Sequence, residues 1–132
     1  MLARAVTHAL VGLEPRRVEV EALVHDGIPG FAIVGLPDRA CADARTRVRS
    51  GIIAAELEFP RGRVTVNLAP AGLRKEGTGY DLPIALALLA ASRQIPQAEL
   101  SRHAAIGEIA LDGRLRRVGG VLGVAEGARR LG

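Results

Sequence analysis

The residues best suited to chemistry lie in one loop, Ala69 to Gly79, between a predicted strand and a predicted helix. The loop contains the only lysine of the chain, Lys75, together with Arg74 and several glycines. A glycine-rich basic loop that opens a helix can bind a phosphate or hold a nucleophile, because free backbone N–H groups and the helix dipole favour negative charge there. The loop is therefore the first candidate for a phosphate cradle or a catalytic centre.

The residue order in this loop does not match a nucleotide-binding motif. Lys75 precedes the glycines, and the Gly-Lys-Ser/Thr order of a Walker A motif is absent. Asp81 is predicted to cap the following helix, and its carboxylate adds negative charge where a phosphate would bind. The sequence therefore disfavours nucleotide binding at this loop.

Arginines on a second predicted helix, starting at Asp38, form the other candidate site. Apolar residues there recur at a spacing of three and four, at Cys41, Ala44, Val48, Ile52 and Ala55. We predict that Asp38 caps this helix and that its polar face carries Arg39, Arg45, Arg47 and Arg49. Such a face could contact DNA phosphates in a salt-sensitive way. The alternatives are a solvated helix face and an interface with a neighbouring domain.

Composition narrows the classes of function. The net charge of +4 permits an acidic partner, but the chain has no Trp, one Tyr and two Phe, so few rings are present to stack on bases. Cys41 is the only cysteine, and His8, His25 and His103 lie far apart, so no metal site is predicted. No secretory signal or membrane-spanning run is present, which predicts a cytoplasmic protein without membrane contact.

The elements that must position these residues form an α+β pattern. Apolar alternation predicts a half-buried strand at residues 18–25, a short strand at 31–34 and a strand at 63–68. A β-rich segment, 3–12, precedes a turn predicted at Glu14–Pro15. A buried helix is predicted at 82–92, and residues 94–100 could add a helical turn. A hairpin follows, with strands at 104–110 and 115–118 around Asp112–Gly113.

The last predicted helix, residues 121–131, has no C-cap beyond Gly132. We therefore predict one domain, residues 1–132, that is excised from a longer protein. The predicted architecture is α+β, a mixed β-sheet packed with about three helices that start near Asp38, Asp81 and Val121.

Several runs resemble the N-terminal domain of Mg-chelatase-like AAA+ ATPases, the ComM (YifB) group. They occur in the order of the family and span essentially the whole chain: residues 29–37 (PGFAIVGLP), 45–50 (RTRVRS), 66–71 (VNLAPA), 75–77 (KEG), 81–85 (DLPIA) and 107–108 (GE). The resemblance implies a Lon-protease-like fold, that of the second domain of ribosomal protein S-five. It also implies an AAA+ domain that follows in full-length members, with ATP and Mg²⁺ bound there and no cofactor in this domain.

The same resemblance implies a homo-hexameric DNA helicase that promotes branch migration during recombination in natural transformation. DNA and the AAA+ domain of the same chain are then the expected partners. The DNA- or partner-contact candidates are Arg45, Arg47, Arg49, Arg74 and Lys75.

The Lon-like fold permits a test for a catalytic dyad. Lon-type proteases carry a serine in a Lys-Asp-Gly-Pro-Ser-Ala-Gly-like run before the central helix, and a lysine soon after a Gly-Gly pair, so that the amine activates the hydroxyl. In this sequence Gly79 occupies the serine position and Leu122 the lysine position. The resemblance therefore implies a non-catalytic domain that serves assembly or DNA engagement. Two alternatives stay open: a peptidase with an unorthodox dyad involving Thr78, and an oligomerisation module without DNA contact.

Overall fold

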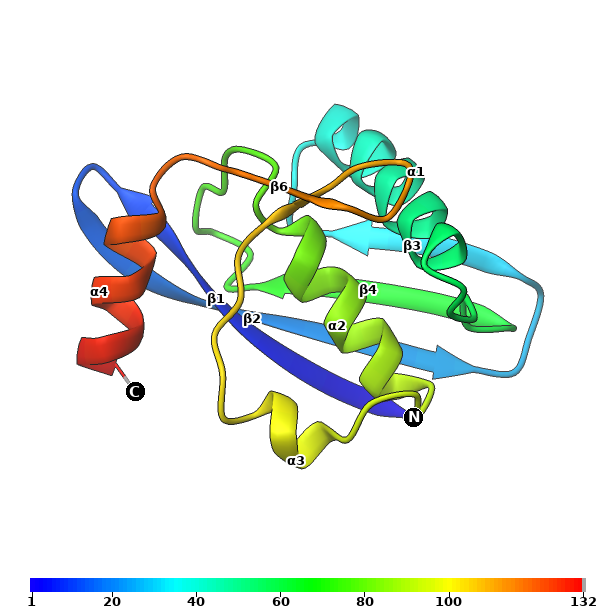
Figure 1. Cartoon of the computed structure of the whole chain (residues 1–132). Coiled ribbons are helices and arrows are strands. Elements are labelled where there is room, and N and C mark those ends of the chain that lie inside the picture. The colour runs from blue at the N-terminus through cyan, green and yellow to red at the C-terminus, as the bar shows by residue number, and fades with distance from the viewer. Residues whose placement is uncertain (132) are drawn as a thin grey trace.

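Figure 1 shows the computed structural model of the chain, which describes residues 1–131. Gly132, on which the prediction of an uncapped last helix rested, lies outside the described residues. The elements in chain order are β1 (Leu2–Val11), β2 (Glu14–His25), β3 (Gly30–Val34), α1 (Asp38–Ala54), β4 (Arg63–Ala69), α2 (Asp81–Ala91), α3 (Gln97–Leu100), β5 (Glu108–Ile109), β6 (Leu115–Arg116) and α4 (Val121–Leu131).

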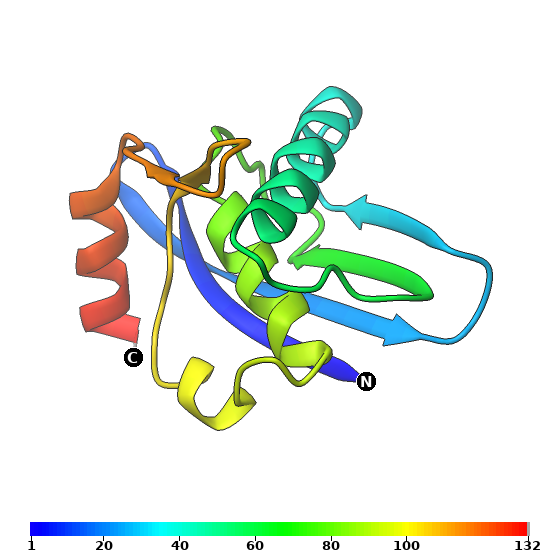
Figure 2. The same ribbon diagram turned by 45° about the vertical axis from the view of Figure 1, so that its right-hand side comes forward.

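The main sheet has four strands in the order β1-β2-β4-β3. The β1–β2 and β2–β4 pairs are antiparallel and the β3–β4 pair is parallel, so the sheet is mixed. A separate two-stranded hairpin joins β5 to β6. Figures 1 and 2 show α1 and α2 side by side across one face of the sheet. The predicted α+β class with a mixed sheet is confirmed. In the described residues α3 adds a single helical turn to the three main helices.

The core lies between this face and α2. Alternate residues of β2 and β4 point into it, and the largest fully buried side chains include Val18, Val20, Val66 and Leu68. Nine of the eleven residues of α2 are buried, as the continuous apolar run predicted. The buried residues of α1 are Cys41, Ala44, Val48, Gly51 and Ile52. The prediction for Ala55 is wrong, because the helix ends at Ala54 and Ala55 is exposed.

Helix α4 packs against the other face of the β1–β2 hairpin, near its turn. His8 and Leu10 alternate with the core-facing residues of β1, so they lie on the face opposite to α2. A Cβ placed on Gly123 would lie 2.7 Å from Leu10, and one on Gly127 would lie 3.0 Å from the His8 ring. The small residues of α4 therefore allow the helix to approach β1 closely. Figure 2 shows this separation of α4 from α1 and α2.

Two predictions of strand boundaries are wrong. Glu14–Pro15 belongs to β2, and the turn is formed by Gly12–Leu13, where Gly12 has a φ of 64°. Glycine at the first central position suits a two-residue hairpin turn, so all of β1 pairs with residues 14–23 of β2. In the second hairpin, the strands are restricted to Glu108–Ile109 and Leu115–Arg116.

The predicted strand at 104–110 is interrupted because Gly107 bonds to other elements. Its N–H donates to the carbonyl of Gly79, and its carbonyl accepts from the N–H of Leu82. Ala104 makes only an isolated parallel bridge to Val6. This segment therefore crosses from β1 to the start of α2 instead of continuing a ladder.

Both predicted N-caps lie one residue inside their helices. Asp38 and Asp81 are the first helical residues, and Pro37 and Tyr80 hold the N-cap positions without a side-chain bond. The extended ψ of 148° at Pro37 already supplies the geometry that starts α1. The Asp81 carboxylate bonds to other elements of the fold.

None of the helices in residues 1–131 combines the length and the apolar composition that a membrane span needs.

Candidate functional site

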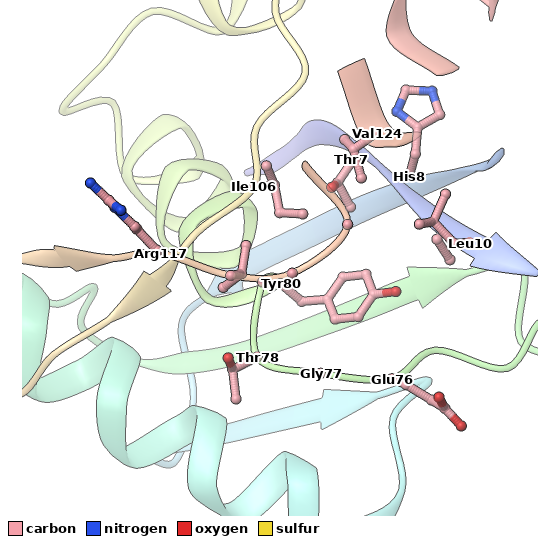
Figure 3. A pocket seen from close by; sticks show the side chains of 15 residues that line it. Thr7, His8, Leu10, Glu76, Gly77, Thr78, Tyr80, Ile106, Arg117 and Val124 are labelled. Atoms are coloured by element: carbon pink, nitrogen blue, oxygen red, sulfur yellow. The ribbon is translucent and has the colours of Figure 1, made fainter. Parts of the chain in front are cut away.

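A cavity of about 580 Å³ opens beside the loop that sequence analysis singled out. Five segments surround it: the end of β1, the residues that lead into α2, Ile106, the segment before α4, and Val124 of α4 itself. Figure 3 shows the Thr7 side chain reaching toward this space from β1 and the Tyr80 ring crossing it from the start of α2. The lining includes Thr7, His8, Leu10, Glu76, Thr78, Gly79, Tyr80, Ile106, Arg117, Gly119, Gly120 and Val124.

The two positions implied for a Lon-like dyad do not meet in this cavity. Gly79 lines the cavity and is buried, and a Cβ placed on it would lie 2.7 Å from Cγ1 of Ile106. Leu122 is 86% exposed and does not line the cavity. The hydroxyl-bearing neighbour Thr78 is half-buried in the wall.

The Lys75 amine is held inside its own loop. Lys75 is 3% exposed, and Nζ donates to the carbonyl oxygens of Pro70 at 2.7 Å and Leu73 at 2.9 Å. Burial lowers the pKa of the amine. The side chain therefore closes the 70–75 turn. Arg74 is exposed and pairs with Glu76 at 2.8 Å.

Arg47 joins α1 to the start of α2. Its Nε lies 2.7 Å from Oδ2 of Asp81, and a second guanidinium nitrogen donates to Oδ1 at 3.1 Å. The N–H of Ile109 also donates to Oδ2. All three partners are donors, which suits an ionised carboxylate at Asp81. Burial raises the pKa of Asp81 and the Arg47 and Ile109 bonds oppose that rise, while the bond to Asp81 raises the pKa of Arg47.

The arginines of α1 do not share one face, so that prediction is wrong. Residues two apart on a helix lie about 200° apart around its axis, which places Arg47 opposite Arg45 and Arg49. Arg47 faces inward to Asp81, whereas Arg49 is exposed and Arg45 half-buried. The Arg49 guanidinium lies 5.1 Å from the centre of the Phe59 ring, a cation–π distance.

The exposed arginines continue past α1. Phe59 packs against Phe31 with ring centres 5.1 Å apart, and Arg63 begins β4 beside β3. Among the described side chains, no carboxylate lies within ion-pair distance of Arg45, Arg49, Arg61 or Arg63. We call these four residues the arginine band.

Two polar atoms beside the cavity lack partners. Thr7 is 0% exposed and His8 4% exposed, and neither Oγ1 of Thr7 nor Nδ1 of His8 has a hydrogen-bond partner among the described residues. Buried polar atoms are nearly always hydrogen-bonded, so these two are exceptions that need an explanation. Tyr80 is also buried, and burial, with the nearby Glu76 charge, raises its pKa to about 12.

Comparison with known proteins assigns the family. The model of the family described as subunit ChlI of Mg-chelatase matches residues 20–132. The chain belongs to this ChlI family. It is 47% identical over 131 residues to YifB of Salmonella typhimurium and 44% identical over 121 residues to the competence protein ComM of Haemophilus influenzae. These matches cover 99% and 92% of this chain, but 26% and 24% of the two relatives. An uncharacterized protein of Mycobacterium tuberculosis is 41% identical over 131 residues.

The predicted resemblance to the ComM and YifB group is therefore confirmed. This ChlI-family chain spans about a quarter of the length of the curated relatives that it matches. Within the described residues, no group of three or more His, Cys, Asp or Glu side chains could hold a metal ion.

Sequence reasoning missed Thr7 and His8 in the ChlI-family chain. Both lie in an otherwise apolar stretch of β1, Ala5 to Leu10. A polar pair within such a stretch indicates buried polar side chains, and this is the sequence feature that could have identified them. Whether their side chains find partners depends on α4 and on the 76–80 loop, which only the folded chain brings close.

The buried His8 predicts that acid destabilises this ChlI-family chain. Burial, with a smaller contribution from Arg17, lowers the pKa of His8 from 6.5. The unfolded chain therefore binds a proton more readily, and stability falls as the pH drops through 6.5 toward the folded pKa. Urea unfolding at pH 7.5 and pH 5.5 should show this loss in the wild type and a smaller loss in His8→Gln. The exposed His103→Gln serves as control, and equal losses in both variants would contradict the assignment to His8.

Proposed function

We propose that this chain is a non-catalytic, Lon-like N-terminal domain of a Mg-chelatase-like AAA+ ATPase, and that it engages the DNA backbone through the arginine band. The observation that carries the proposal is the band itself: four arginines on adjoining elements without ion-pair partners among the described side chains. Membership of the ChlI family and similarity to a competence protein support this context. The rest of the ATPase would bind ATP and Mg²⁺, since this chain lacks a Walker A motif.

The arrangement of the band suits phosphate contact more than base reading. Arg49 lies over the Phe59 ring at 5.1 Å. Arg63 pairs with Gly30, the residue before Phe31, and alternates with the buried Val64, so its side chain leaves the opposite face of the sheet. The guanidinium groups are therefore spread along α1 and the edge of the sheet. Phe31 and Phe59 are half-buried against each other, which limits stacking on bases. Contacts of this kind position DNA without reading its sequence. Arg47 is engaged by Asp81 and Lys75 by backbone carbonyls, so neither is part of the proposed surface.

The cavity supports the non-catalytic part of the proposal. No hydroxyl stands at position 79, the neighbouring Ile106 leaves little room for one, and Leu122 is exposed and does not line the cavity. Loss of both dyad groups removes the nucleophile and its base. We further propose that the full-length protein is a cytoplasmic homo-hexamer that acts in recombination, where this domain docks beside the ATPase ring.

Charge reversal in the band should weaken DNA binding. In Arg45→Glu/Arg49→Glu, the dependence of log binding constant on log salt should become shallower by about 2, since each phosphate contact contributes about 0.9. Fluorescence anisotropy with labelled single- and double-stranded DNA over a salt series measures this slope.

The matched control is Arg129→Glu/Arg130→Glu on α4, which makes the same change in net charge where both arginines already pair with Glu126. Equal effects of the two double variants would contradict a specific role for the band. Absence of DNA binding by the wild type even at low salt would contradict the proposal and favour the alternative of an oligomerisation module without DNA contact.

A further inference from the structure

Helix α4 is held to the rest of the fold almost entirely by its contact with the β1–β2 hairpin. Among the described side chains of α4, only Val124 is a buried apolar one, and it lies outside the core that β2, β4 and α2 form. Two of the eleven residues of α4 are glycine, and each glycine inside a helix costs about 1 kcal/mol relative to alanine. The helix therefore depends on this one contact, and its release would leave the core closed.

The His8 ring forms part of the contact between α4 and the hairpin. His8 is 4% exposed, and a Cβ placed on Gly127 of α4 would lie 3.0 Å from Cδ2 of the ring. Figure 3 shows the ring directed away from Tyr80, beside the ribbon of α4. Nδ1 is buried without a hydrogen-bond partner among the described residues. A neutral imidazole suits this position better than an imidazolium, because protonation would place a charge in the contact.

The nearest charged neighbour of His8 is a cation. Arg17 lies directly opposite His8 on the same face of β2, and no described carboxylate lies within ion-pair distance of Arg17. The diagonal neighbour Glu19 is paired with Arg4 at 3.0 Å. The α4 residue against the ring is the uncharged Gly127. The other titratable or charged groups of the surrounding elements are Glu14, Glu126, Arg129 and Arg130, which pair with one another, and Glu76, Tyr80 and Arg117 of the cavity wall.

We propose that protonation of His8 releases α4 from the β1–β2 hairpin while the sheet and α2 stay folded. The imidazolium and Arg17 would repel each other at the surface on which α4 lies, and the helix gives up few buried contacts when it leaves. Val124 lines the cavity of about 580 Å³, so release of α4 also opens that cavity on one side. Neither α4 nor the hairpin carries a residue of the arginine band, so the inference is independent of the proposed DNA contact.

The direction of the pH dependence follows from proton linkage. Burial and Arg17 lower the pKa of His8 from 6.5 while α4 is in place, and release of α4 returns the ring to water. The released form therefore binds a proton more readily. The fraction of released α4 should rise as the pH falls below 6.5, by up to about tenfold per pH unit, and should level off below the pKa of the docked form.

Hydrogen exchange of the 132-residue chain, followed by NMR at pH 7.5, 6.5 and 5.5, tests this release. Each amide rate is divided by the intrinsic rate at the same pH, and residues 124–130 of α4 are compared with residues 84–91 of α2. We expect the α4 amides to exchange through an opening that leaves α2 protected, and their protection to fall as the pH drops below 6.5. His8→Gln should remove this fall, whereas the exposed His103→Gln should keep it.

His8→Lys supplies a fixed charge and separates release from unfolding. At pH 7.5 its α4 signals should move to the positions of an unfolded segment, while the signals of α2 and β4 keep their native positions. Equal protection of α4 and α2 at every pH would show that α4 opens only with the whole fold. That result, or an unchanged pH response in His8→Gln, would overturn the proposal.

Discussion

Replacing Arg47 by leucine should lower the free energy of unfolding by about 3–5 kcal/mol. The reason is the carboxylate that would remain. Asp81 has 1% of its side chain exposed, and two of its three hydrogen bonds come from the Arg47 guanidinium. Without Arg47, a buried charge would keep only the Ile109 amide as partner. The loss should be large because the cost is the unpaired charge and not the missing surface arginine.

A comparison within α1 isolates this effect. Arg45→Leu removes the same chemical group from the same helix, but Arg45 has no ion partner among the described side chains, so its unfolding free energy should change by less than about 0.5 kcal/mol. The double variant Arg47→Leu/Asp81→Leu should recover most of the loss, since it leaves no charge unpaired. Urea denaturation curves measure all three. Similar destabilisation in Arg45→Leu and Arg47→Leu would show that the Asp81 pair does not dominate.

Restoring a serine at position 79 should destabilise the chain by about 1–3 kcal/mol and should not create a peptidase. A Cβ at Gly79 would lie 2.7 Å from Cγ1 and 3.1 Å from Cδ1 of Ile106, both closer than ordinary packing allows. Ile106 lies in the segment whose neighbour Gly107 bonds to Gly79 and Leu82. Because the backbone on both sides is tied together, the side chain has little freedom to move away.

Gly72→Ser is the matched control. It lies in the same loop, nothing stands within 4 Å of its added Cβ, and its φ is not positive. Thermal unfolding should therefore show little change for Gly72→Ser and a clear loss for Gly79→Ser. Incubation of both variants and the wild type with casein should yield no cleavage products. Cleavage by the wild type that Thr78→Ala abolishes would support the peptidase alternative and contradict the proposed function.

Most helices and strands that a local residue pattern defines were predicted correctly. β4 alternates cleanly, with Val64, Val66 and Leu68 buried, and α2 is apolar on nearly every side because it is central. Prediction from the local residue pattern failed where hydrogen bonds between distant segments decide where a strand begins or ends. The segment before β5 was predicted as a continuous strand, but Gly107 is used by the loop and by α2. Glu14–Pro15 has the residue types of a turn, but Gly12 accepts the positive φ of 64° that the two-residue loop at Gly12–Leu13 requires.

The candidate site was predicted in outline and not in detail. The loop leading into α2, which the sequence marks as the first candidate for chemistry, lines a cavity, and so does Gly79, the position that the resemblance gives for the serine. The roles of its cations were not predictable. Lys75 and Arg47 look like free surface charges in the sequence, yet each is bound to an internal partner: Lys75 to carbonyls of its own loop, and Arg47 to a carboxylate 34 positions away.

The family, the α+β class, the buried helix and the absence of a Walker A lysine can be read from residue order alone, since they depend on motifs and on periodicities of two and 3.6 that neighbours along the chain define. Which charges are paired inside the fold, and that Thr7 is buried without a hydrogen-bond partner among the described residues, became clear from the folded chain. Hydrogen bonds and ion pairs act over a few ångströms in space and take no account of distance along the chain. The chemistry of this protein therefore depends on contacts between β1, the loop before α2 and α4 that no local pattern contains.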